Sequence, residues 1–155
     1  MNDIIRIANI NNYHLEIINN ELILTPINNY ITEDELYNKN LKHSKVNYCL
    51  ITDNTNNIIS NNSNNYSSIL ADIYKSMSAS IILQNTSFNI KLTNEAGRCG
   101  YIWNSNINMS IQSKDAIGTL KEIIKMVILN NYNININIKL ANGEIINYKN
   151  KTNLR

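Results

Sequence analysis

The sequence predicts an α+β protein: an antiparallel sheet with two long amphipathic helices and one short capped helix, extended by N- and C-terminal β-hairpins. Three observations predict this class. Apolar and polar residues alternate over several short stretches, which is typical of half-buried strands. Two longer stretches repeat apolar residues every three or four positions, as amphipathic helices do. Asparagines and glycines stand between these stretches, where turns are expected.

Asparagine and isoleucine dominate the composition, with 33 and 29 of the 155 residues. Both have AT-rich codons, so the bias indicates an AT-rich genome, such as that of a large DNA virus or a phage. The apolar fraction of 43% is that of a globular protein, whereas the charged fraction of 17% is low. We therefore expect one folded domain over residues 1–155 with an asparagine-covered surface.

Residues 1–30 are predicted to form strands, with an isoleucine-dense stretch at 3–10 and then a hairpin. Asn19 and Asn20 form the turn of this hairpin, because asparagine tolerates the positive φ that a two-residue loop requires. The turn sets apolar residues opposite each other and gives the hairpin one apolar face. These pairs are Ile17 with Leu22 and Leu15 with Leu24.

A short helix is predicted to begin after Thr32. Thr32 and Glu35 have the spacing of a capping box, and Ile31 and Leu36 are placed as a hydrophobic staple. The acidic residues at 33–35 could also suggest a metal site. No histidine or further acid lies at a suitable spacing, so we assign them to helix capping.

Residues 46–130 are predicted to form the core of the domain. A nearly continuous apolar run at 46–53 predicts a central strand, and a short strand follows at Ile58 and Ile59. Two helices each carry an apolar stripe, and a cap at Ser113 precedes the second. The first stripe is Tyr66, Ile69, Leu70, Ile73, Tyr74 and Met77, and the second is Ile117, Leu120, Ile124, Val127 and Ile128.

Three alternating segments between these helices predict an antiparallel meander over residues 87–112, because their connections are short. The alternating residues are Phe88, Ile90 and Leu92, then Cys99, Tyr101 and Trp103, then Ile107, Met109 and Ile111.

A C-terminal hairpin is predicted over residues 133–149, with its turn at Asn142 and Gly143. A two-residue loop would pair Leu140 with Ile145. A three-residue loop ending at Glu144 would pair Leu140 with Ile146 and Ile138 with Tyr148, and the hydrophobic pattern favours it. Residues 150–155 are expected to be a frayed tail.

The element order in the middle of the chain is helix, strand, strand, helix, three strands, helix. It rests on a strand–turn–strand at 46–60, a helix at 66–80, the meander at 87–112 and a closing helix at 116–127. This order resembles the roadblock family of dynein light chains and GTPase-regulator scaffolds, within the longin and profilin-like group. The resemblance covers residues 46–129 and lacks the glycine that is often found in the first turn. It implies a non-catalytic dimerising scaffold that pairs through a sheet edge and a helix.

The sequence contains no motif for catalysis, for a metal or for a cofactor. It has no glycine-rich phosphate loop, no nucleophile elbow and no Cys-x-x-Cys pair. His14 and His43 are expected at the surface, and Cys49 and Cys99 are expected to be small buried thiols within strands. Asp53 ends a strand and fits a turn initiator better than a catalytic acid.

The candidate binding site is formed by Arg98, Tyr101 and Trp103. A flexible hairpin tip with this arginine beside two aromatic rings could bind an anion, a nucleotide base or the backbone of a partner. In the structural alternative, Gly97 supplies a turn, Trp103 fills the core and Arg98 is solvated.

The absence of a catalytic constellation favours a non-catalytic interaction or assembly module, associating with itself as a homodimer or a larger oligomer, or with another protein. The alternative is a virus- or phage-encoded accessory protein that binds a host factor or a small nucleotide-like ligand. An enzyme is the third class. The net charge of +2 without a basic stripe disfavours nucleic acid. No membrane span or signal peptide is predicted, so we expect the cytoplasm, or the host cytoplasm for a viral protein.

Overall fold

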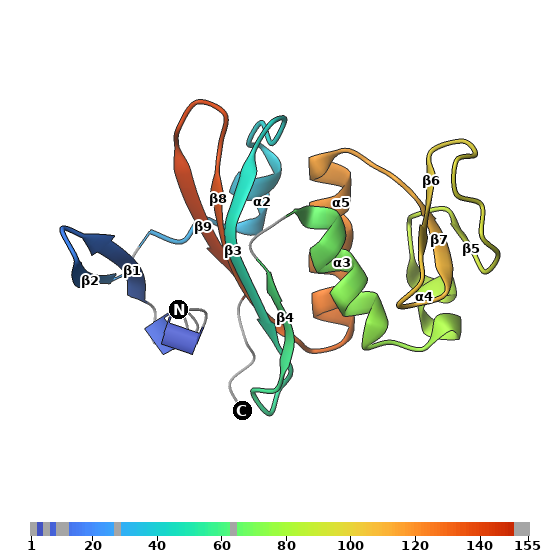
Figure 1. Cartoon of the computed structure of the whole chain (residues 1–155), viewed down its shortest axis with the longest axis horizontal. Coiled ribbons are helices and arrows are strands. Elements are labelled where there is room, and N and C mark those ends of the chain that lie inside the picture. The colour runs from blue at the N-terminus through green and yellow to red at the C-terminus, as the bar shows by residue number, and fades with distance from the viewer. Residues whose placement is uncertain (1–2, 5–6, 9–12, 27–28, 63–64, 151–155) are drawn as a thin grey trace.

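A computed structural model describes residues 3–4, 7–8, 13–26, 29–62 and 65–150 (Figure 1). It confirms the predicted α+β class. The elements are β1 (Tyr13–Ile18), β2 (Glu21–Pro26), α2 (Glu33–Tyr37), β3 (Lys45–Thr52), β4 (Ile58–Asn62), α3 (Tyr66–Lys75), α4 (Ala79–Asn85), β5 (Ile90–Lys91), β6 (Tyr101–Asn104), β7 (Met109–Gln112), α5 (Ala116–Leu129), β8 (Asn133–Lys139) and β9 (Ile145–Lys149).

A four-stranded antiparallel sheet in the order β4-β3-β8-β9 forms the middle of the molecule, and α3 and α5 lie against one of its faces (Figure 1). The run at 46–53 is an interior strand, as predicted, because β3 lies between β4 and β8. The helix-facing residues of β3 and β8 belong to the buried core. They are Val46, Cys49, Ile51, Ile134, Ile136 and Ile138.

The other face of this sheet carries a ladder of asparagine side chains. A β-bulge between Val46 and Tyr48 places both Asn47 and Tyr48 on this face, because the extra residue interrupts the alternation of the strand. The Asn47 amide then donates to Asn137 Oδ1 at 2.7 Å, and the Asn137 amide donates to Asn147 Oδ1 at 2.7 Å. The ladder therefore links β3, β8 and β9 through side chains as well as through the backbone.

The helix signals near residue 32 and in the first long helix are confirmed. Thr32 Oγ1 accepts from the Glu35 amide at 3.1 Å, and Glu35 Oε1 accepts from the Thr32 amide at 3.3 Å, which completes the capping box. α3 begins after Asn65, whose side chain accepts from the Ser68 amide at 2.8 Å. Of the predicted stripe, Met77 lies beyond the end of the helix and is partly buried. The other five residues are buried: Tyr66, Ile69, Leu70, Ile73 and Tyr74.

Three details of the later helices differ from the prediction. The cap of α5 is Asp115 rather than Ser113, because the Asp115 carboxylate accepts from the Gly118 amide at 2.8 Å. Ile128 is 54% exposed, and Ile123 takes its expected place in the buried stripe. The helix predicted up to residue 80 ends at Lys75, and a separate helix, α4, begins after the Ser78 cap. Serine caps both ends of this break, since short hydroxyl side chains satisfy exposed helix ends.

The small sheet is antiparallel, but it is not a meander. Its order is β5-β7-β6, so β7 is the central strand and β5 pairs with β7 instead of β6. The long loop at 92–100 between β5 and β6 makes this crossing possible. This sheet lies beyond α3 and α5, on the side away from the main sheet (Figure 1).

The two terminal hairpins form as predicted, with one change of register. In β1–β2, Asn19 and Asn20 have φ of 53° and 66°, and Leu15 lies opposite Leu24. In β8–β9, Ile138 pairs with Ile146 and Ile136 with Tyr148, two residues away from the predicted register. The Leu140 amide bonds Glu144 O at 2.8 Å, and Gly143 at φ 90° closes a three-residue loop at 141–143. A shift of two keeps the same side chains on the same face, so the pattern alone did not distinguish the registers.

Within the stretch predicted to be strand-like at 3–10, the described residues 3–4 and 7–8 are helical. In the predicted tail, Asn150 is described: its Oδ1 accepts from the Ile134 amide at 2.9 Å and its amide donates to Tyr132 O at 2.9 Å. Residues 151–155 lie outside the described residues. Among the helices that the structure describes, none has the length and apolar content required to cross a bilayer.

Candidate functional site

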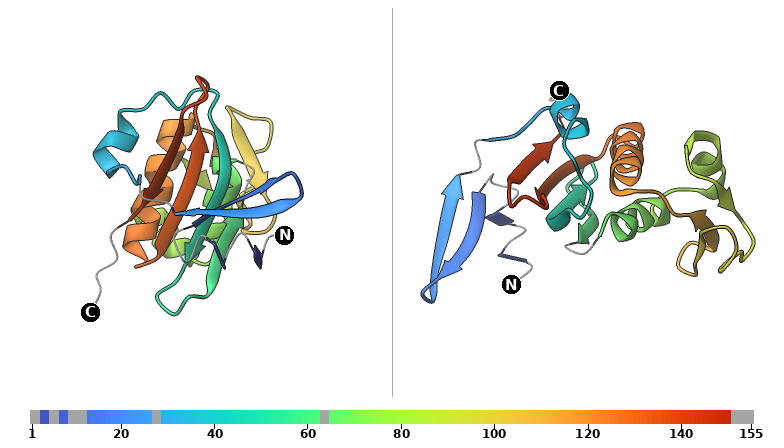
Figure 2. Two further views of the ribbon diagram at one scale, coloured as in Figure 1. Left: turned by 90° about the vertical axis from the view of Figure 1, so that its left-hand side faces the viewer. Right: turned by 90° about the horizontal axis from the view of Figure 1, so that it is seen from above.

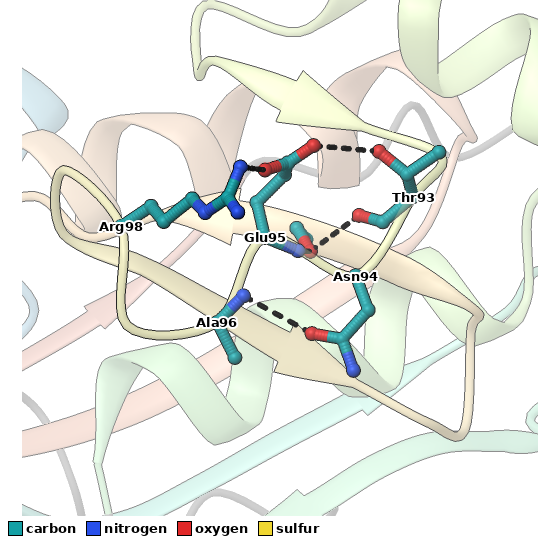
Figure 3. Close-up of polar contacts among 6 residues, drawn as sticks. Thr93, Asn94, Glu95, Ala96 and Arg98 are labelled. Carbon is teal, nitrogen blue, oxygen red and sulfur yellow. Dashed lines mark hydrogen bonds and ion pairs between the residues drawn. The ribbon is translucent and has the colours of Figure 1, made fainter.

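The loop that carries Arg98 is held by a buried serine of the central strand β7. Ser110 is 0% exposed; its hydroxyl donates to Thr93 O at 2.7 Å and accepts from the Glu95 amide at 2.8 Å. Within the loop, Asn94 Oδ1 accepts from the Ala96 amide at 3.0 Å (Figure 3). The Ser110 hydroxyl therefore fixes the segment before Arg98 by acting as both donor and acceptor.

The second half of the loop is a tight turn. Gly97, Cys99 and Gly100 have φ of 82°, 47° and 79°, a region that favours glycine. The Gln112 side chain donates to Cys99 O at 2.7 Å, which holds this turn against β7. Cys99 is exposed and lies in the turn, which corrects the prediction of a buried thiol within a strand. Its positive φ explains the difference, because the turn directs this residue out of the sheet.

The Arg98 guanidinium points toward the acid of its own loop (Figure 3). Its NH1 lies 3.7 Å from Glu95 Oε2, and the arginine side chain is 81% exposed while the glutamate side chain is 21% exposed. Thr93 Oγ1 orients the same carboxylate by donating to Glu95 Oε1 at 2.8 Å. The acid weakens the attraction of this site for an anion, although an exposed pair of this kind contributes at most about 1 kcal/mol.

Tyr101 and Trp103 share one face of β6, because they stand two residues apart on the strand. Both are half-buried, and Trp103 lies outside the buried core cluster, contrary to the structural alternative. Lys91 Nζ lies 5.3 Å from the centre of the Tyr101 ring. The structure thus brings the two aromatic residues together, while Arg98 is directed to Glu95.

A buried carboxylate connects the small sheet to α5. Glu122 is 1% exposed; it accepts from the Ser87 amide at 3.0 Å and from the Ser87 hydroxyl at 2.6 Å. Lys114 Nζ donates to Ser87 O at 2.8 Å from the other side. The Ser87 amide is already used by Glu122, so it is not available to stabilise an oxyanion. This cluster anchors the connection between α4 and β5 and does not have the arrangement of a nucleophile site.

Asp53 is a turn residue, as predicted. Its Oδ1 accepts from the amides of Thr55 and Asn57 at 2.8 and 2.9 Å. Partial burial would raise the pKa of Asp53, but the hydrogen bonds from Asn57 and Thr55 outweigh it and the pKa is lowered.

The remaining reactive side chains stand apart from one another. Burial, and then the nearby Asp72 charge, raises the pKa of the Cys49 thiol well above its ordinary value, which keeps it protonated and unreactive. His43 is exposed in a loop at φ 60°. Among the described residues, no three His, Cys, Asp or Glu side chains gather closely enough to hold a metal ion.

Among the described residues, the β1–β2 hairpin, for which the sequence predicts an apolar face, forms a prominent exposed apolar surface. Five of its large apolar side chains are markedly exposed: Ile17 at 53%, Ile18 at 46%, Leu22 at 58%, Ile23 at 37% and Leu24 at 55%. The hairpin stands to one side of the main sheet in Figure 1 and in the right-hand view of Figure 2. Alternation of this kind normally indicates burial, so no local signal in the sequence revealed the exposure.

Comparison of the chain with protein-family models, with curated proteins and with solved structures found no match. The roadblock resemblance therefore stays a prediction.

Proposed function

We propose that the protein is a non-catalytic assembly module that associates with itself. The observation that carries this proposal is the β1–β2 hairpin, which exposes large apolar side chains and stands away from the rest of the molecule (Figure 2). Contiguous exposed apolar surface of this kind marks interaction sites in soluble proteins. A two-stranded hairpin is also marginally stable by itself, so a partner that covers it would stabilise it.

The low charge of the chain supports self-association. The net charge is +2 and charged residues make up 17% of the sequence, so repulsion between copies is weak. Unlike a catalytic site, an assembly surface needs no convergent acid, base or metal ligand. Among the described residues, the buried carboxylate of Glu122 and the buried thiol of Cys49 serve the packing of the fold.

Sedimentation equilibrium of the full chain tests this proposal. The measured mass is expected to rise above the 17.8 kDa of one chain as the concentration increases from about 1 μM to about 500 μM. Mutual burial of apolar surface is the reason for the expected rise. A mass that stays at 17.8 kDa over this whole range would contradict the proposal.

The alternative function, binding of a small nucleotide-like ligand at Arg98, Tyr101 and Trp103, receives less support. Glu95 lies 3.7 Å from the Arg98 guanidinium and offsets the charge that an anionic ligand would need. Lys91 already lies near the Tyr101 ring. We therefore place self-assembly through the hairpin first.

A further inference from the structure

The two faces of the β1–β2 hairpin differ in chemistry. Residues paired across the hairpin share a face, and the pairs Leu15–Leu24 and Ile17–Leu22 alternate with Glu16–Ile23 and Ile18–Glu21. One face, which we call face A, is Tyr13, Leu15, Ile17, Leu22 and Leu24. The opposite face, which we call face B, is Glu16, Ile18, Glu21 and Ile23. Face A is therefore entirely apolar, whereas each described pair on face B contains a carboxylate.

Face A is open to solvent over most of its length. Ile17, Leu22 and Leu24 each keep more than half of their surface exposed, at 53%, 58% and 55%, and Tyr13 keeps 38%. Leu15 is partly exposed as well. A fully exposed aliphatic or aromatic residue has an accessible surface of about 200 Å², so face A exposes roughly 450 Å² of side-chain surface per copy. A patch of this size is comparable to the largest apolar patch of a typical monomer, of about 300–600 Å², and such patches are often interaction sites. Because an isolated two-stranded sheet is marginally stable, a partner packed on this face would stabilise it.

A second copy of the same face is the cover that these residues fit. Face A contains no charged group, so packing one face A on another removes no charge from water and brings no like charges together. Packing of face B on face B would bring Glu16 and Glu21 of both copies into one interface. A symmetric contact of this kind closes after two copies, because each partner uses the same surface.

The area indicates a weak dimer. Two copies of face A would bury about 900 Å² in total, less than the roughly 1,000 Å² that a stable specific interface exceeds and within the range of weak, transient contacts. The expected dissociation constant is therefore on the order of 1 μM or weaker, although area alone does not set affinity. We infer that the protein forms a two-fold symmetric dimer by packing face A of the β1–β2 hairpin against face A of a second copy. This inference rests on the proposed self-association and specifies its partner, face and symmetry.

A matched pair of substitutions on neighbouring residues of β2 tests the inference. Leu24→Lys places a charge on face A and Ile23→Lys places the same charge on face B. In sedimentation equilibrium, Leu24→Lys is expected to weaken dimerisation at least about tenfold, because each dimer then carries two buried charges. Ile23→Lys is expected to change it less than about threefold, because its site stays solvated opposite Glu16. Circular dichroism checks that both variants keep the fold.

Cross-linking provides a second readout, which reports the residues that meet in the dimer. In a Cys99→Ser background, which removes the exposed thiol, Leu24→Cys is expected to give a disulfide-linked dimer under mild oxidation. Ile23→Cys is the matched control and is expected to stay a monomer. Cys49 is buried and does not compete.

The outcomes separate the inference from the proposed function. If the wild-type protein associates but both lysine variants behave alike, or Ile23→Cys cross-links as readily as Leu24→Cys, the interface lies elsewhere and the inference fails while self-association stands. A mass that continues to rise beyond two chains indicates head-to-tail contacts and also overturns the two-fold arrangement. A wild-type protein that stays a monomer overturns both.

Discussion

The hairpins β1–β2 and β8–β9 are built from similar residues but have opposite environments. Each alternates aliphatic side chains with polar ones, and each turns through residues that adopt positive φ: Asn19 and Asn20 in the first, Gly143 in the second. Yet Ile136 of β8 is 0% exposed, whereas Ile17 of β1 is 53% exposed. The difference lies in the neighbours, because β8 pairs with β3 and packs under α5 while β1 pairs with β2 alone. Local sequence determines that a hairpin forms, and tertiary contacts determine whether it is a core or a surface.

The largest expected difference between the two hairpins is in the free energy of unfolding that is lost when one isoleucine of each is replaced by alanine. Ile136→Ala should lower the free energy of unfolding by about 2–5 kcal/mol, because it removes buried methylenes and leaves a cavity. Ile17→Ala should change it by about 0.5 kcal/mol or less in the monomer, since the side chain is mostly solvated there. Urea denaturation at low protein concentration measures both. Similar losses at the two positions would show that the first hairpin is packed in solution.

Substitutions in the turns of the two hairpins should also affect global stability more in β8–β9 than in β1–β2, but by a smaller amount. Gly143→Ala is expected to cost about 1–2 kcal/mol, since φ of 90° strains a residue with a Cβ although no atom lies within 4 Å of it. Asn20→Ala, at φ 66°, should strain its own turn but hardly change global unfolding, because β1–β2 can open without disturbing the main sheet. Amide hydrogen exchange distinguishes the two, with faster exchange in β1–β2 alone expected for Asn20→Ala.

The smallest expected effect is a pH dependence of stability that arises in the turn between β3 and β4, at Asp53. The lowered pKa of Asp53 means that its hydrogen bonds contribute stability above the unfolded pKa of about 3.9. This contribution is lost as the pH falls through the folded value. Asp53→Asn should therefore show a flatter decline of stability below about pH 4 than the wild type. Parallel curves in urea denaturation from pH 2 to pH 7 would contradict this assignment.

The features predicted correctly from the sequence are those determined by residues close together in the chain. The Thr32–Glu35 box, the Asn19–Asn20 turn and the stripe of α3 each depend on spacings of a few residues. The order β5-β7-β6 was not predictable in this way, because any antiparallel arrangement of three short alternating strands fits the same pattern.

The candidate site shows the same division. The sequence placed Tyr101 and Trp103 together, since strand alternation sets residues two apart on one face. The contact of Glu95 with Arg98 is an exception to this division: the two residues are three positions apart, yet the pairing was not predicted, because it depends on the turn at Gly97. The exposure of Leu22 and Leu24 was hidden for a related reason, since alternation indicates which residues share a face but not what covers that face.

The position of β8 between β3 and β9 has a consequence for how the chain folds. The pairing of Lys45 with Lys139 joins residues about ninety positions apart, and contacts of such long range slow folding. During synthesis β3 and β4 emerge well before β8, so one edge of β3 has no partner until the last part of the described chain is made. In that interval β3, a largely apolar strand with a free edge, is open to pairing with other nascent chains. Synthesis rate and chaperone supply should therefore affect the yield of this protein more than its final stability would indicate.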